Sequence, residues 1–131
     1  MKSLLSNTLN TFTFILLYML IFSPGCRLPK EISEMKFEMP DLQMAKSGSY
    51  TGIQDSGIVS AEVQVMINKG EIREVIIIRH DTGMGKKAET ITDSIIKYQS
   101  VELDAISGAT ASSKTILKAT EKAIIKSIQN N

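Results

Sequence analysis

Apolar and polar residues alternate along the middle of the chain. Between residues 59 and 67, alternate positions are apolar and the positions between them are mostly polar or charged. This period of two is typical of a β-strand with one buried face. After residues 68–70 the run IREVIIIRH is again rich in β-branched side chains. The two runs predict an antiparallel hairpin that turns at residues 68–70. The apolar face comprises Val59, Ala61, Val63, Val65 and Ile67.

A shorter strand is expected ahead of the hairpin. It includes Tyr50 and Thr51, and the pattern is broken by Gly52 and by the residues QDSG at 54–57. With the hairpin this strand makes a meander of three strands.

The apolar period becomes helical after His80. In AETITDSIIKYQS, residues 88–100, Ile91 and Ile95 recur at helical spacing with either Ile96 or Tyr98. A short extended piece, 101–105, precedes a final helix. Strands followed by helices predict an α+β fold, an antiparallel β-meander packed with two C-terminal helices in a single domain. The apolar stripe of the final helix comprises Ile116, Ala119, Thr120, Ala123, Ile124 and Ile128. Its lysines at 114, 118, 122 and 126 are interpreted as a solvated face.

The first 25 residues differ in composition from the rest. Lys2 precedes the apolar run FILLYMLIF at 14–22, which ends at SPGC. A spanning helix needs about 20 apolar residues, whereas this shorter run is typical of a secretory signal peptide. Cys26 follows it and resembles the lipidated first residue of mature bacterial lipoproteins. We therefore expect a signal peptide at 1–25 and lipidation at Cys26, with a plain cleaved signal or an uncleaved anchor as alternatives.

Residues 26–45 contain two prolines, mixed charges and no sustained apolar period. They are interpreted as a tether to a domain at 46–131. The alternative is a short helix around residues 32–37 that lies on the domain.

The charge balance and the scarce histidine and cysteine exclude several classes of function. Lys2 is the one charged residue of the first 25, so 14 of the 15 basic side chains remain against 14 acidic ones. A neutral chain gives no electrostatic reason to expect nucleic acid as a partner. His80 is the sole histidine and Cys26 the sole cysteine, so neither a Ser-His-Asp triad nor a Cys/His metal site is expected. The segment GMGKK, 83–87, lacks the glycine spacing and the Ser or Thr of a phosphate loop.

One stretch combines a loop of small residues with the start of the last helix. It reads DAISGATASSKTILKATEKAIIKSI, from Asp104, and the first acidic residue after Thr110 is Glu121. A helix start without acidic side chains leaves its amide groups and positive dipole end open to an external anion. The alternative interpretation is an ordinary Ser or Thr cap beside an ordinary glycine turn.

The residues Asp104, Ser107, Gly108, Ala109 and Thr110 fit the pattern Asp-x-x-Ser/Thr-Gly-Ala-Thr. In this motif, and in the order of strands and helices over residues 46–128, the chain resembles the FMN-binding domain family. That family includes subunits of the Rnf complex and of the sodium-pumping NADH:quinone reductase.

The resemblance implies that FMN is bound covalently, through a phosphoester to Thr110 made by a flavin transferase that uses FAD as donor. Asp104 would belong to the signal that the transferase recognises, and residues 107–109 would shape the loop. It also implies that the flavin ring lies near His80, Thr82, Gly83 and Met84. From the residues alone, a lone histidine at a strand end such as His80 is more often a surface or structural residue than a catalytic one.

The implied protein is an electron-transfer carrier rather than a stand-alone enzyme. It would be tethered by a lipid anchor to the outer face of the bacterial cytoplasmic membrane, with membrane electron-transfer proteins as partners. The alternatives are an interaction module of a lipoprotein, which binds FMN reversibly or not at all, and a small reductase with noncovalent flavin.

Overall fold

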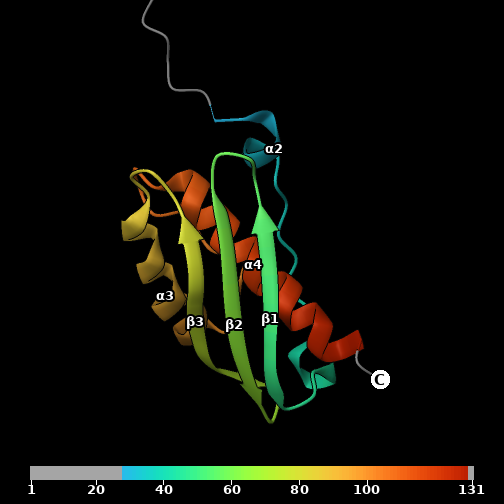
Figure 1. Ribbon diagram of the computed structural model, residues 1–131. Coiled ribbons are helices and arrows are strands. Elements are labelled where there is room, and N and C mark those ends of the chain that lie inside the picture. Colours follow the sequence, from blue (N-terminus) through green and yellow to red (C-terminus); the bar gives the residue numbers. More distant parts are fainter. Residues whose placement is uncertain (1–27, 130–131) are drawn as a thin grey trace, which may run out of the picture.

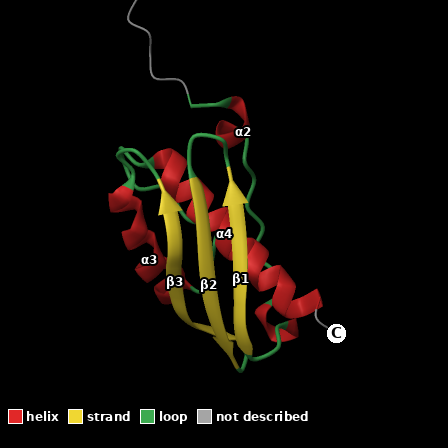
Figure 2. Cartoon of the chain, in the orientation of Figure 1, coloured by secondary structure: helices red, strands yellow, loops and turns green. Residues whose placement is uncertain are grey.

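The computed structural model describes residues 28–129, which form an antiparallel sheet covered by helices. The strands β1 (Gly48–Asp55), β2 (Ser60–Asn68) and β3 (Glu71–Asp81) pair in the order β1-β2-β3. Helix α4 (Thr110–Gln129) lies across the back of the sheet and α3 (Ile91–Tyr98) lies beside β3 (Figure 1, Figure 2). The predicted α+β fold is therefore confirmed. The shorter helices are α2 (Lys30–Ser33), η1 (Leu42–Met44) and η2 (Lys86–Thr90).

The core lies between the sheet and α4, as the alternation of β2 predicts. All five residues of its predicted apolar face are buried, from Val59 to Ile67. The four that lie within β2, from Ala61 to Ile67, pack with buried residues of α4, including Ile116 and Ile124. Lys69 and Gly70 form the turn between β2 and β3 with positive φ angles of 51° and 73°. Two successive positive φ angles match the right-handed twist of a hairpin, which explains why glycine follows lysine here.

The interpretation of Gly52 as a strand break is wrong. β1 runs unbroken through Gly52, which pairs with Val63 of β2. A Cβ atom at Gly52 would overlap the carbonyl oxygen of Ala119 and stand 2.7 Å from the amide nitrogen of Ala123. The glycine therefore lets the backbone of α4 lie directly against the backbone of β1.

The segment before β1 packs on the domain. Ile32 of α2 is fully buried, and Phe37, Met39 and Leu42 pack against the core. These contacts agree with the alternative of a short helix on the domain, although that helix spans Lys30–Ser33. From residue 28 onward, the segment that was interpreted as a tether therefore packs on the domain. The expected signal peptide at 1–25 and Cys26 lie outside the described residues.

The four lysines spaced along α4 bond to backbone carbonyls, so their interpretation as a merely solvated face is wrong. Lys114 Nζ donates to the carbonyls of Ile32 and Ser33, each at 3.0 Å. Lys118 reaches the carbonyl of Lys36 at 3.0 Å, and Lys122 and Lys126 reach carbonyls of β1 at 3.2 and 2.6 Å. The first pair fastens the N-terminal segment, and the second covers part of the open edge of the sheet. Across residues 28–129, we find no helix with both the length and the apolar character needed to span a bilayer.

Candidate functional site

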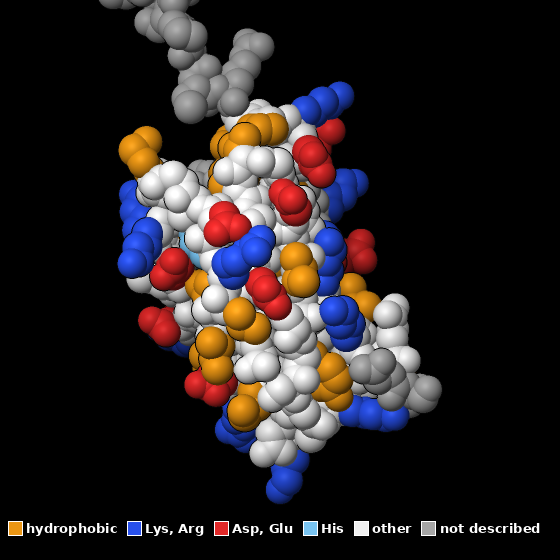
Figure 3. All heavy atoms as spheres, viewed as in Figure 1, with side chains coloured by type: hydrophobic (Ala, Val, Ile, Leu, Met, Phe, Trp, Pro, Cys, Tyr) orange, Lys and Arg blue, Asp and Glu red, His pale blue; other side chains and the backbone are white. Residues whose placement is uncertain are grey.

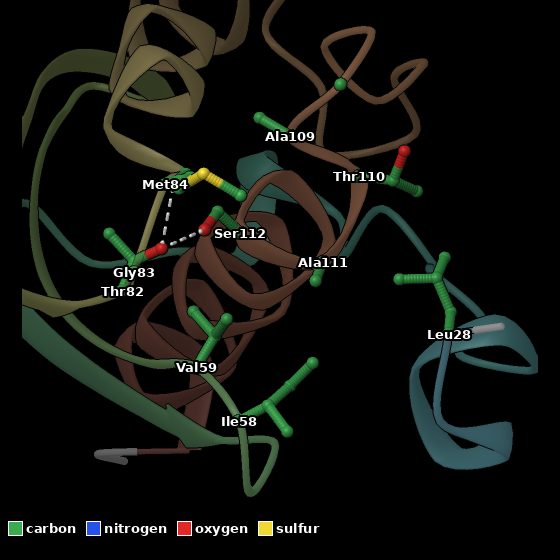
Figure 4. Close-up of a pocket in the computed structure, with 12 residues that line it drawn as sticks. Leu28, Ile58, Val59, Thr82, Gly83, Met84, Ala109, Thr110, Ala111 and Ser112 are labelled. Atoms are coloured by element: carbon green, nitrogen blue, oxygen red, sulfur yellow. Dashed lines mark hydrogen bonds between the residues drawn. The ribbon is translucent and has the colours of Figure 1, made fainter. Parts of the chain in front are cut away.

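A pocket of about 490 Å³ lies where β1 and β3 end and α4 begins. Its volume falls within the range of about 300–1,000 Å³ that small-molecule sites occupy. Figure 4 shows its walls around the first turn of α4. The lining comes from four segments: Leu28, residues 58–59 after β1, residues 82–85 after β3, and residues 108–112.

The pocket brings together predicted site residues that are distant in the sequence. Thr82, Gly83 and Met84 form one wall, and Gly108, Ala109 and Thr110 form another. Asp104 and Ser107 are exposed and do not line it. The motif is thus divided into a part inside the pocket and a part open to solvent.

A hydrogen-bonded turn shapes the motif loop. The amide of Ala109 donates to the carbonyl of Ile106 at 2.9 Å, and Gly108 has a φ of 73°. Positive φ at the third residue of such a turn favours glycine. Ser113 holds the turn from α4, because its Oγ accepts from Ile106 N at 3.0 Å and donates to Ala109 O at 2.9 Å. Sequence reasoning missed Ser113, since a serine inside a helix carries no distinctive signal.

The start of α4 contributes Thr110 to the pocket lining. The helix begins at Thr110, and its first turn has no acidic residue. Its first internal bond is Ser113 N to Ala109 O at 2.9 Å, so the three preceding amides have no acceptor within the helix. Thr110 is half-buried, and among residues 28–129 its hydroxyl has no hydrogen-bond partner. By contrast, the hydroxyl of Thr115 bonds to the carbonyl one turn earlier, at 2.9 Å.

Thr82 connects the two walls of the pocket through hydrogen bonds. Its Oγ1 accepts from Gly85 N at 3.0 Å and lies 3.1 Å from Ser112 Oγ on α4 (Figure 4). A Cβ atom at Gly85 would overlap Ser112 Oγ, so this loop passes directly over the helix start. Thr82 therefore positions the loop against α4, as well as lining the pocket.

Lys87 adds a positive charge beside the motif loop. Its Nζ is 2.7 Å from the point that a Cβ of Gly108 would occupy. Lys87 belongs to the segment GMGKK, which fails the spacing of a phosphate loop, and sequence reasoning therefore set it aside. The fold nevertheless brings this lysine to the small-residue loop, because η2 returns the chain towards the start of α4.

His80 lies outside the lining of the pocket. Its side chain is 2% exposed, and Nδ1 donates to Oε1 of Glu89 at 3.1 Å. Its Nε2 is buried without a partner among the described residues. This geometry fits the structural interpretation of His80. The described residues also contain no cluster of three or more His, Cys, Asp or Glu side chains able to hold a metal ion.

An open pocket with a free hydroxyl, a helix N-terminus and a nearby ammonium defines a site for a phosphate-bearing ligand. In agreement, residues 56–125 match the model of the FMN-binding domain. The match covers more than half of the chain, which therefore belongs to the FMN-binding domain family, and FMN is its cofactor. It includes all pocket residues except Leu28.

The fold also occurs in a solved structure. The crystal structure of the CPE2226 protein from Clostridium perfringens is 22% identical, with a TM-score of 0.52. The similarity covers 63% of this chain and 88% of that one, and at this identity it shows the fold alone. No curated protein matches this chain significantly in sequence.

Proposed function

We propose that this chain is an extracytoplasmic electron-transfer flavoprotein, with FMN bonded through its phosphate to Thr110 and a lipid anchor at Cys26. The free Thr110 hydroxyl in the pocket carries the proposal. Other hydroxyls on the same helix are used in hydrogen bonds within the protein, as at Ser113 and Thr120. Thr110 remains available as an acceptor of a phosphoryl group.

The residues around Thr110 suit a phosphodiester. The amide hydrogens at the N-terminus of α4 favour a negatively charged phosphodiester there. The first turn has no carboxylate that would compete for these amides. Lys87 offers an ammonium from the neighbouring loop. In the apolar part of the lining, Val59 is buried and suits the flavin ring, while Ile58 and Met84 are exposed at the rim of the pocket. The site therefore fits both ends of FMN.

The attachment reaction requires a separate transferase. The Thr110 oxygen bonds to the phosphorus on the FMN side of FAD, the pyrophosphate bond breaks, AMP leaves, and the hydroxyl proton goes to a base of the transferase. The exposed positions of Asp104 and Ser107 support their recognition by such a partner, because both can be contacted from outside the pocket.

When bound, FMN supplies one- and two-electron chemistry, and the protein's part is to hold and orient it. Ser113, Thr82 and Gly108 keep the two walls of the pocket in place. A covalent bond retains the cofactor where no cytosolic supply can replace it. We infer that membrane electron-transfer proteins are the partners.

The experiment is expression of the full chain in a bacterium with and without a flavin transferase. We expect flavin fluorescence that survives denaturing electrophoresis only when the transferase is present. Fluorescence of the native protein that disappears on denaturation would instead show reversible binding. A chain without flavin under both conditions would contradict the proposal.

A further inference from the structure

The N-terminal segment enters the domain at the mouth of the pocket. Leu28 lines the pocket together with Thr110 and Ala111 (Figure 4). The segment is fixed there, because Ile32 is fully buried and Lys114 holds the carbonyls of Ile32 and Ser33. The position of Leu28 is thus set by contacts with α4.

The covalent geometry of the chain limits the distance between Cys26 and Leu28. Cys26 stands two positions before Leu28 with Arg27 between them, and two extended peptide units span at most about 7 Å. Acyl groups on Cys26 would therefore enter a bilayer near the pocket. This step rests on the lipid anchor of the proposed function.

Exposed apolar side chains stand at the same mouth. Met84 is 94% exposed and Ile58 is 59% exposed, although both line the pocket. Lys86 and Lys87 follow Met84 after one intervening residue, Gly85, and both lysines are exposed. Figure 3 shows hydrophobic side chains projecting at this end of the molecule, with both basic and acidic side chains near them. Apolar side chains next to lysines are the combination that lies favourably in the interface of an anionic membrane.

We propose that the pocket end of the domain rests on the membrane surface, with Leu28, Ile58 and Met84 facing the lipid. The short chain distance between Leu28 and the acylated Cys26 favours a bilayer over any other occupant of the surface formed by these three side chains. The turn between β2 and β3 then points away from the membrane, because it lies at the opposite end of the sheet (Figure 1). The flavin site consequently opens towards a redox partner within the membrane.

The orientation can be tested on the lipidated full chain in vesicles of phosphatidylethanolamine and phosphatidylglycerol that carry nitroxide-labelled lipid. A fluorophore is attached at Met84→Cys or, as the control, at Asn68→Cys beside the distal turn. Cys26 is acylated and does not react. We expect lipid quenching to be at least about twofold greater at position 84, because interfacial side chains enter only the outer layer of the bilayer.

Each result has a separate meaning. Equal quenching at the two positions in a chain whose N-terminal peptide carries acyl groups would overturn the orientation and leave the proposed function intact. A chain without acyl groups would overturn both. A spectral change at position 84 that needs no vesicles and increases with protein concentration would identify a second copy as the occupant and overturn the membrane contact.

Discussion

Lys87 meets Gly108, a residue of the pocket wall, with Lys87 Nζ 2.7 Å from the position of a glycine Cβ. The two residues come from different loops, and the contact depends on the absence of a side chain at 108. It places an ammonium beside the hydroxyl-bearing loop without a direct partner carboxylate in the described residues. The phosphate of FMN is the anion that this arrangement suits.

Replacing Lys87 should weaken reversible binding of FMN. In protein made without the transferase, we expect Lys87→Gln to raise the Kd about two- to fivefold, as befits loss of an exposed charge. Titration followed by flavin fluorescence measures this. The control is Lys86→Gln, which removes the same charge from the neighbouring residue. Equal effects of the two substitutions would show that only net charge matters.

Gly108→Ala should impair flavin attachment more than its effect on stability explains. The φ of 73° costs roughly 1–2 kcal/mol for a residue with a Cβ. The new methyl group would also displace Lys87. Gly57→Ala is the matched control, because Gly57 has a φ of 77° and no atom within 4 Å of its Cβ position. We expect the two variants to have similar melting temperatures, and only Gly108→Ala to have a lower flavin occupancy. Equal flavin occupancy in the two variants would show that the loop at Gly108 has no special role in attachment.

Gly52→Ala should be strongly destabilising. The added Cβ overlaps the backbone of α4 at Ala119, and neither backbone can move without breaking the core contact. Overpacking of this kind costs about 3 kcal/mol. Chemical unfolding of the mature chain measures the loss in free energy of unfolding. Gly83→Ala is the control, because its Cβ meets nothing within 4 Å. A small loss in the free energy of unfolding for Gly52→Ala would mean that α4 shifts easily along β1.

Loss of Lys122 and Lys126 should expose the edge of the sheet. These side chains bond to the carbonyls of Ile53 and Thr51 on β1. We expect the double substitution to glutamine to leave the fold intact and to promote self-association, since unpaired strand edges recruit other strands. Light scattering at increasing concentration detects this. A variant that stays as monomeric as the parent would show that the lysines do not protect the edge.

The fold was predictable where one residue pattern had one structural meaning. The alternation from Val59 to Ile67 and the turn at Lys69 gave the hairpin, and Ile91 and Ile95 gave the first long helix. Gly52 was misinterpreted because close backbone contact and a strand break both favour glycine. The lysines of α4 were misinterpreted because their acceptors are carbonyls of distant segments, which no sequence pattern marks.

The site was predictable only in part, because some of its residues are brought together by tertiary packing that no sequence pattern marks. The motif from Asp104 to Thr110 is contiguous and could be recognised directly. Tertiary packing alone brings Ser112 into the pocket lining and Lys87 and Ser113 against the motif loop, and their residue types are ordinary for a loop or a helix. The resemblance to the family implied that His80 lies near the flavin, whereas the ring of His80 makes a buried contact with Glu89 and lies outside the pocket lining.

The central claim is that Thr110 carries the flavin, and peptide mass spectrometry of protein purified from its own membranes tests it most directly. We predict a peptide with a mass increment of FMN less water, with fragment ions that assign the adduct to Thr110 rather than to Ser107, Ser112 or Ser113. Thr110→Ala should lack the adduct while its melting temperature stays close to that of the parent. An unmodified Thr110 peptide in membranes where the transferase is active would contradict the account.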